Sequence, residues 1–198
     1  NRTAMLDPVT GQVTEKQLPG EPADKPYGIA VNSKGVVWYT KYSENKLGWY
    51  DSATDETKEW SLPKPDSGPH RMHIDDNDNL WIPLSGYGTV LRYNTIDGSQ
   101  QEYALPEKDT FPYVLRYDAS SDRVWITGNG ANSIYALNPH TGRIQTFRMP
   151  SLYSYGRMVA IDHSTGDVWT ALASYPNKLS LRDHSIVVRI HHALQKLD

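Results

Sequence analysis

The sequence predicts an all-β fold: a β-propeller of four-stranded antiparallel blades, with about four blades present as part of a six- or seven-bladed ring. The first observation is a tryptophan in a short apolar run that recurs every 43 or 44 residues, at Trp38, Trp81, Trp125 and Trp169. Two further markers keep the same period. Strand-like runs end at Asp7, Asp51, Asn94 and Asn138, and proline stops follow at Leu18-Pro19, Leu62-Pro63, Leu105-Pro106 and Met149-Pro150. Four short strands in a unit of roughly 40 to 45 residues are typical of propellers.

Each unit contains four short runs rich in Val, Ile, Tyr and Trp, separated by Gly, Asn, Asp, Ser and Pro. In the first complete unit we expect strands at about 28–32, 36–40, 46–51 and 57–62. The segments NSKG, DNDN, ASSD and HSTG are expected to join the first two strands of a unit, and DPVTG and NPHTG the last two, because Pro and Gly stand at turn positions. No stretch sustains a helical period except the terminal HHALQKLD.

The repeat divides the chain into a partial blade at 1–26, blades at 27–69, 70–112 and 113–156, a last partial blade at 157–190 and a tail at 191–198. Aligned on the repeat, the chain begins in the loop before a third strand, and seventeen strands are expected in all. We therefore expect a fragment, the C-terminal part of a larger propeller. A closed four-blade ring is the alternative, in which VTEKQL would complete the last blade and leave one strand surplus.

The four repeated tryptophans are expected in the core. On the second strand of each blade, an aromatic ring would pack between neighbouring sheets and bury a large apolar area. At roughly 25 cal/mol per Å², each ring contributes several kcal/mol before the entropy cost is subtracted. The sequence therefore predicts four tryptophans that are mostly buried between blades.

Composition excludes several classes of protein. The chain has 198 residues, of which 38 % are apolar, a net charge of −3 and a pI near 6.2, so it shows no basic signal for nucleic-acid binding. No apolar run approaches the roughly 18 residues of a membrane span. Cysteine is absent, which excludes disulfides, thiol nucleophiles and thiolate metal sites and fits a bacterial periplasmic or secreted protein. No GxSxG, HExxH or P-loop motif is present.

One unit carries a recognisable pattern at Pro26, Gly28–Val31, Gly35–Thr40, Asn45–Asp51 and Lys58–Pro63. Together with DPVTGQVTE near the N-terminus, it resembles the repeat of the virginiamycin B lyase (streptogramin lyase) family, and the resemblance covers the whole chain. The resemblance implies a seven-bladed propeller. It also implies an elimination that opens the ester-closed ring of type B streptogramins, with a histidine base and a magnesium ion that stabilises the enolate.

The family's motif places the base eleven residues before the repeated tryptophan, which is the position of His70 relative to Trp81. Its magnesium-binding glutamates lie two residues before that histidine and at the end of the motif WFTE. Gly68 and Leu84 occupy those two positions here, and the second position in the other units holds Lys41, Gly128 and Leu172. Because magnesium requires hard oxygen ligands, no metal-ligating residue is assigned and no cofactor is expected. A magnesium cofactor is expected only if the full-length protein is an active lyase.

Each unit has a residue at the position equivalent to His70. In chain order these residues are Tyr27, His70, Tyr113 and Arg157. In a propeller these residues would surround one mouth of the central channel, with Lys41 adding a second positive charge. Apolar walls with a few convergent polar groups are typical of ligand sites. We therefore take His70 as the candidate base and Tyr27, Lys41, Tyr113 and Arg157 as candidate ligand-binding residues for an aromatic or anionic small molecule. The alternative is that they are ordinary loop residues with their polar ends in water.

The other histidines give weaker signals. His73 fits either the core or the channel, and His140 and His163 lie in turns. The pair His191-His192 lacks the partner spacing of a metal site.

Two functions remain open from the sequence. The first is a small-molecule-binding or accessory/scaffold module of a larger extracytoplasmic protein or complex, with its ligand or protein partner at the propeller face. The alternative is a C–O lyase that linearises a cyclic depsipeptide of the streptogramin B type by magnesium-assisted elimination. The absence of the acidic pair favours the first for this segment, and the repeat keeps the second open.

Overall fold

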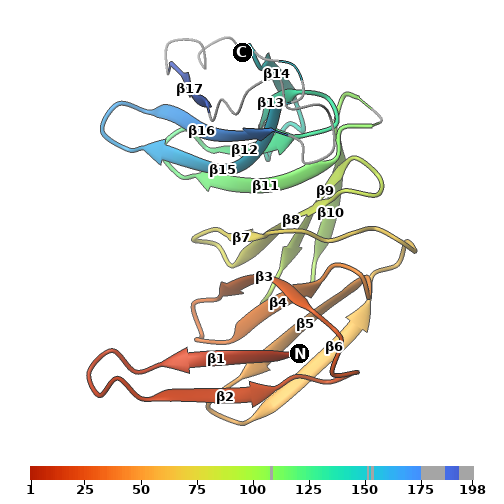
Figure 1. Cartoon of the computed structure of the whole chain (residues 1–198), viewed down its shortest axis with the longest axis vertical. Helices are drawn as coiled ribbons and strands as arrows, with labels where there is room; N and C mark the ends of the chain where they lie inside the picture. The colour runs from red at the N-terminus through yellow and green to blue at the C-terminus, as the bar shows by residue number, and fades with distance from the viewer. Residues whose placement is uncertain (108, 151, 153, 175–185, 192–198) are drawn as a thin grey trace.

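The computed structural model describes residues 1–107, 109–150, 152, 154–174 and 186–191. The described part is all-β, with seventeen strands in five antiparallel sheets and no helix. The sheets follow one another along the long axis of the molecule, from the N-terminal hairpin to β17 at the opposite end (Figure 1). The expected strand number is therefore confirmed, whereas the predicted tail lies outside the described residues from position 192 onward.

The sheets are built from strands that are consecutive in the chain. The first sheet is a hairpin of β1 (Arg2–Leu6) and β2 (Val13–Gln17). The second contains β3 (Pro26–Val31), β4 (Val37–Lys41), β5 (Lys46–Asp51) and β6 (Glu56–Ser61). The third contains β7 (His73–Ile74), β8 (Asn79–Leu84), β9 (Thr89–Asn94) and β10 (Gln100–Ala104). The fourth contains β11 (Pro112–Asp118), β12 (Arg123–Gly128), β13 (Ser133–Leu137) and β14 (Ile144–Arg148). The last contains β15 (Ser154–Asp162), β16 (Asp167–Ser174) and β17 (Ile186–Ile190).

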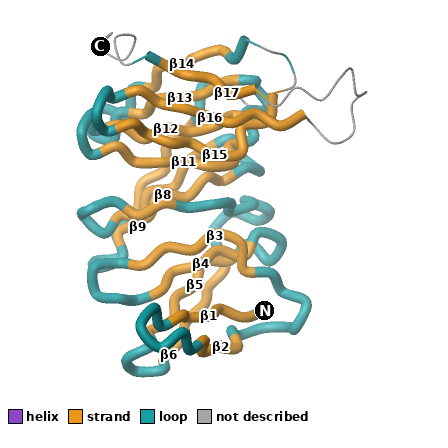
Figure 2. The backbone as a smooth tube through the Cα atoms, turned by 60° about the vertical axis from the view of Figure 1, so that its left-hand side comes forward, coloured by secondary structure: helices purple, strands orange, loops and turns teal. Residues whose placement is uncertain are grey.

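These elements confirm the predicted blade. The four strands expected in the first complete unit are β3 to β6, each within two residues of its predicted bounds. Each four-stranded sheet is a meander in chain order, and Figure 2 shows strands and loops alternating along the whole described chain. The row of sheets is open, so the number of blades in a complete ring and the blade boundaries stay predictions. Within the described residues, no helix is long and apolar enough to span a membrane.

The Asp and Asn residues that keep the repeat period have a structural reason. Each ends the third strand of a blade, and its side-chain oxygen accepts a hydrogen bond from the backbone N–H two residues later, at 2.8 to 2.9 Å. Such Asx turns reverse the chain locally without help from the rest of the fold. The four residues are Asp7, Asp51, Asn94 and Asn138. The period seen in the sequence therefore reflects the regular spacing of these turns along the chain.

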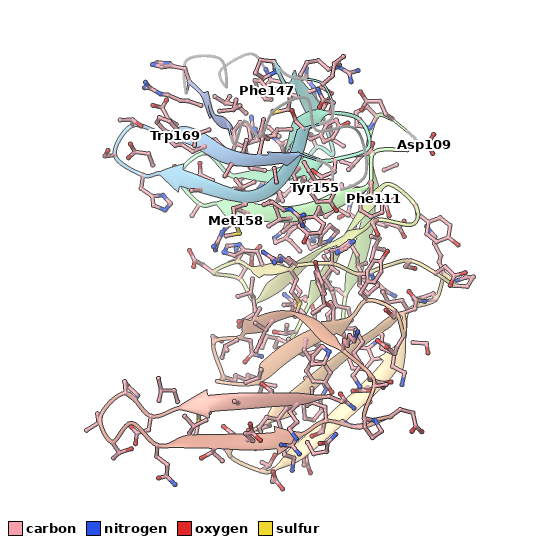
Figure 3. All side chains as sticks on the ribbon, viewed as in Figure 1. Asp109, Phe111, Phe147, Tyr155, Met158 and Trp169 are labelled. Carbon is pink, nitrogen blue, oxygen red and sulfur yellow. The ribbon has the colours of Figure 1, made fainter. Side chains whose placement is uncertain are left out.

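The tryptophans of the second strands fill the spaces between successive sheets. Trp38, Trp81 and Trp125 are 4 %, 1 % and 0 % exposed, and each belongs to an apolar cluster shared with the following sheet. The prediction is wrong for Trp169, which is 36 % exposed on β16. Figure 3 shows this side chain on the side of β16 away from β11. Since no sheet follows β15–β17 among the described residues, this ring lacks the packing between sheets that buries the other three, and the guanidinium of Arg189 lies over it at 5.6 Å.

The first strands of the blades carry a repeated irregularity. The register of β3, β11 and β15 against their neighbours shifts between Pro26 and Ile29, between Pro112 and Leu115, and between Gly156 and Met158. The third sheet shows the same interruption, because β7 pairs only at residues 73–74 and an isolated bridge joins Pro69 to Leu84. Bulges re-aim side chains and are common next to binding sites. The four positions singled out by the repeat all fall inside these irregular segments.

Candidate functional site

The structure brings together the four residues that occupy equivalent positions in the blades. The ring of His70 lies 5.2 Å from that of Tyr27 and 4.8 Å from that of Tyr113, measured between centroids. The hydroxyl oxygens of Tyr27 and Tyr113 are 2.7 Å apart, and an Arg157 N–H donates to the Tyr113 hydroxyl at 3.3 Å. The four side chains therefore form one group at the edge of the inner strands. Their roles toward a ligand stay predictions.

His70 lies at the bottom of this group in a box of aromatic rings. It is 5 % exposed, and the rings of Tyr42 and Phe111 complete the box at 4.4 and 5.6 Å. Phe111 has a φ of +48°, an uncommon conformation for a residue with a side chain. Figure 3 shows Phe111 and Tyr155 near the start of β11. The sequence did not single out Tyr42 or Phe111, although Tyr42 directly follows Lys41 and Phe111 lies two residues before Tyr113.

The backbone of His70 is fixed by hydrogen bonds, whereas its ring makes none with the described residues. Its N–H donates to the carbonyl of Pro83 at 3.0 Å, and its carbonyl accepts the hydroxyl of Thr40 at 3.0 Å. The same hydroxyl accepts the N–H of Gly28 at 2.9 Å. A Cβ at Gly28 would lie 2.7 Å from the His70 carbonyl oxygen, so only glycine allows the two inner strands to approach this closely.

The imidazole of His70 is poorly suited to act as a base. Neither ring nitrogen has a hydrogen-bond partner among the described residues. Burial lowers the pKa of His70 to about 4, with a further contribution from the positive charge of Arg71. A general base works best with a pKa near the operating pH. The ring is therefore neutral at physiological pH and covered by the tyrosines that a substrate would have to pass.

The two tyrosine hydroxyls have opposite tendencies to ionise. Burial raises the pKa of Tyr27 to about 12, together with the hydrogen bond to Tyr113. Burial also raises the pKa of Tyr113. Hydrogen bonds from Tyr27 and Arg157 and the charges of Arg71 and Arg157 outweigh that effect and leave it below its ordinary 10.0. Tyr113 is thus the group at which negative charge is stabilised.

Arg71 is a member of this group that the sequence did not indicate. Its guanidinium carbon lies 5.9 Å from the ring centroid of Tyr27 and 5.6 Å from that of Tyr113, and an N–H reaches the sulfur of Met158 at 3.6 Å. Figure 3 shows Met158 on the side of β15 that faces β7. The only sequence signal was its place directly after His70, inside the irregular start of the first strand.

A hollow of about 420 Å³ opens beside this group between the first strands of four blades. Tyr27, Arg71, His73, Arg116 and Met158 line it, with apolar wall from Ile29, Ala30, Ile74, Val114 and Leu115. A second hollow of about 520 Å³ continues past His73 and Arg116 toward Asp76 and His163. Both hollows lie along the inner strands, so this face of the molecule offers apolar wall interrupted by charged and polar side chains.

The surroundings of Lys41 do not fit its predicted role as a ligand-binding residue. Its side chain is fully buried, and its ammonium lies 2.7 Å from a Glu59 oxygen, 3.2 Å from Asp24 and 2.5 Å from the carbonyl of Pro19. An ammonium has three N–H donors, so these partners leave none for a ligand. Lys41 is placed as a buried structural cation because two carboxylates enclose it on the side away from the channel group.

Within the part of the chain that the structure describes, the remaining histidines do not gather into a metal site. His73 is half-buried, and its Nδ1 accepts the backbone N–H of Tyr117 at 3.2 Å. His140 is exposed and pairs with Asp122 at 2.7 Å. Of the terminal pair, His192 lies outside the described residues. No three His, Asp or Glu side chains gather in the described part of the chain in a way that could hold a metal ion.

Comparisons with known proteins agree on the fold. No protein-family model matches the chain, and no curated protein matches it. Among solved structures, the chain is similar to selenomethionine-substituted virginiamycin B lyase from Staphylococcus aureus, with a TM-score of 0.77 and 24 % identity over 96 % of this chain and 63 % of that one. It is equally similar to a catalytically inactive histidine-to-alanine variant of that enzyme with Quinupristin, with a TM-score of 0.76 and 23 % identity over the same shares.

A different class of protein shares the architecture as well. Kuenenia stuttgartiensis hydrazine synthase matches with a TM-score of 0.69 and 13 % identity over 90 % of this chain and 50 % of that one. Identities this low show the fold alone. The chain therefore has a virginiamycin B lyase-like β-propeller fold, and it spans about 63 % of the length of the lyase chains that it matches.

Proposed function

We propose that this chain is a small-molecule-binding propeller module of a larger extracytoplasmic protein or complex, and that its ligand enters the hollow beside Tyr27. The observation that carries the proposal is the partly exposed Tyr27 ring, 39 % accessible, on the wall of a hollow that also presents Arg71 and Arg116. An apolar hollow with a few convergent polar groups is the usual form of a ligand site. The aromatic face offers stacking to a ring of the ligand.

Binding is favoured over elimination by the surroundings of His70. The ring is buried, unpaired and weakly basic, and the two positions that would hold metal-binding glutamates are Gly68 and Leu84. Without a divalent cation, the enolate of an elimination would need another source of positive charge. Of the guanidiniums nearby, that of Arg157 donates to the Tyr113 hydroxyl and that of Arg71 lies over the rings of Tyr27 and Tyr113.

The experiment is a calorimetric titration of the purified chain with Quinupristin, the compound present in one of the similar lyase structures. We expect saturable binding without a change in the mass of the compound. Tyr27→Ala should weaken the binding about tenfold, since an aromatic contact contributes roughly 0.5–1.5 kcal/mol beyond its buried area. Tyr87→Ala is the matched control, because Tyr87 is similarly exposed, at 43 %, outside the hollow.

Two results would contradict the proposal. The first is the absence of saturable binding by a chain whose circular dichroism shows intact β structure. The second is equal affinity for Tyr27→Ala and Tyr87→Ala. Cleavage of Quinupristin, detected by mass spectrometry, would instead establish the lyase.

A further inference from the structure

Three arginines on the inner strands have no acidic partner among the described residues. Arg71 lies over the rings of Tyr27 and Tyr113 and donates to the sulfur of Met158. Arg157 contacts the Tyr113 hydroxyl and the rings of Tyr113 and Tyr155. The side chain of Arg116, on β11, makes no hydrogen bond or ion pair with the described residues. Arg71 and Arg157 are exposed and Arg116 is half-buried, so this side of the molecule carries positive charge that no acidic side chain of the described residues neutralises.

Two of these charges act on the same side chain. The guanidinium carbons of Arg71 and Arg157 each lie 5.6 Å from the ring centroid of Tyr113, and both charges lower the pKa of its hydroxyl. A negatively charged group beside this hydroxyl would gain charge-assisted hydrogen bonds from guanidiniums that have no carboxylate partner among the described residues.

The guanidiniums also have donors to spare. Arg157 lies 4.4 Å from the ring centroid of Tyr155 and Arg71 lies 5.6 Å from that of Tyr113. A guanidinium has more N–H donors than the hydrogen bonds to Tyr113 and to Met158 use, so donors remain for an oxyanion. Arg71 and Arg116 open onto the same hollow of about 420 Å³, which is large enough for a phosphate or carboxylate group.

The nearest acidic side chains do not compete for this place. Asp75 is buried and accepts hydrogen bonds from the indole of Trp81 at 2.9 Å and from Asn79. Asp75 and Asp76 line the second hollow, which Arg116 also lines. The first hollow, beside Tyr27 and Arg71, has no acidic side chain in its wall among the described residues.

We propose that Arg71, Arg116 and Arg157, with the hydroxyl of Tyr113, form an oxyanion-binding site that receives the phosphate or carboxylate group of a small molecule. The inference deepens the proposed function, on which it rests, because it names the charged end of the ligand whose other part lies against Tyr27. Arg71 and Arg157 hold the oxyanion near Tyr113, and Arg116 adds the third charge from the floor of the hollow.

The test uses inorganic phosphate and succinate as two separate probes, titrated by calorimetry at constant ionic strength. We expect saturable binding of at least one probe, and the tighter one identifies the chemistry of the natural group. Arg71→Gln and Arg157→Gln should each weaken binding by about 10- to 100-fold, since a hydrogen bond to a charged group contributes roughly 1.5–3 kcal/mol. Arg143→Gln is the control, because Arg143 is an exposed arginine in a turn far along the same chain.

A second readout guards against variants that fold poorly. A bound oxyanion beside Tyr113 should raise the pH at which that tyrosine ionises, which NMR of carbon-13-labelled tyrosine rings follows in the wild-type chain, with Tyr113 assigned through Tyr113→Phe. Saturable binding lost in both arginine variants and kept in Arg143→Gln, together with this shift, supports the site. Failure of both probes to bind, or equal binding by all variants, overturns it even if Quinupristin binds. If the probes bind and Quinupristin does not, the oxyanion site stands and the aromatic half of the proposed function fails.

Discussion

Two sets of positively charged side chains in this molecule differ in their burial and in their pairing with carboxylates. Lys41 is fully buried, and its ammonium is enclosed by Asp24, Glu59 and the carbonyl of Pro19. Arg71 and Arg157 lie at the channel, exposed and without a carboxylate among the described residues. Removing a charge from water is costly unless it is paired, so the first group serves stability. The second keeps its charge available, which is the arrangement a ligand site requires.

The largest expected effect comes from breaking the paired group. Lys41→Met should lower the free energy of unfolding by about 3–5 kcal/mol, because Asp24 would lose its cation and the buried Glu59 would keep only the longer pair with Lys46, at 3.5 Å. Urea unfolding followed by circular dichroism measures the loss. Lys25→Met is the control, since Lys25 is exposed, and it should stay within about 0.5 kcal/mol of wild type. Equal stability of the two variants would show that Lys41 is not the structural cation described here.

A similar contrast separates the inner sheets from the last one. Trp125→Ala should lower the free energy of unfolding by about 3–5 kcal/mol, because the ring is completely buried between two sheets. Trp169→Ala should cost only about 1 kcal/mol, because its ring is 36 % exposed. The same urea titrations measure both. Comparable losses would mean that the Trp169 side of β16 is covered in solution.

The next effect depends on pH and concerns His70. Its pKa is about 4 in the folded chain and 6.5 ordinarily, so the unfolded chain binds the proton first as the pH falls. The free energy of unfolding should therefore decrease by up to about 3 kcal/mol between pH 6.5 and pH 4 and be fully retained above pH 6.5. His73, with its pKa also lowered to about 4 by burial and by Arg116, adds to the same slope.

Replacing His70 isolates its share. His70→Phe should flatten this pH dependence and leave stability at neutral pH unchanged or higher, because two unpaired ring nitrogens are replaced by apolar atoms. Chemical unfolding at several pH values measures both quantities. An unchanged slope would indicate that His70 is accessible to protons in the folded chain, and would reopen its role as a base.

The smallest expected effect is that of magnesium. With Gly68 and Leu84 at the positions of the family's glutamates, added Mg²⁺ should not shift the thermal unfolding midpoint, and Quinupristin should keep its mass after incubation. Mass spectrometry with and without a chelator measures this. Turnover that requires Mg²⁺ and disappears in His70→Ala would contradict the prediction and show that other acids complete a metal site.

The fold could be predicted from the sequence because its turns depend on residues that are close together in the chain. The turns at Asp7, Asp51, Asn94 and Asn138 are closed by hydrogen bonds between residues two positions apart, so their period is visible without any tertiary information. The burial of a tryptophan, in contrast, depends on whether another sheet follows. That is why the repeat predicted Trp125 correctly and Trp169 wrongly.

The site was only partly predictable for a related reason. Equivalence in the repeat identified Tyr27, His70, Tyr113 and Arg157, because residues at one repeat position lie on one face of a propeller. It could not show that Lys41 points into two carboxylates, since Asp24 and Glu59 come from other parts of the chain. It also passed over Arg71, whose direction is set by the irregular pairing before β7.

The ionisation of Tyr113 tests most directly the claim that unneutralised positive charge surrounds this residue. Carbon-13 labelling of the tyrosine rings allows each of the tyrosines to be followed by NMR during a pH titration, with Tyr113 assigned through Tyr113→Phe. We predict that Tyr113 loses its proton below its ordinary 10.0 and before Tyr27, whose pKa is raised to about 12, and that Arg157→Gln moves the Tyr113 pKa upward. A Tyr113 that titrates at or above 10.0, or that does not respond to Arg157→Gln, would contradict the account.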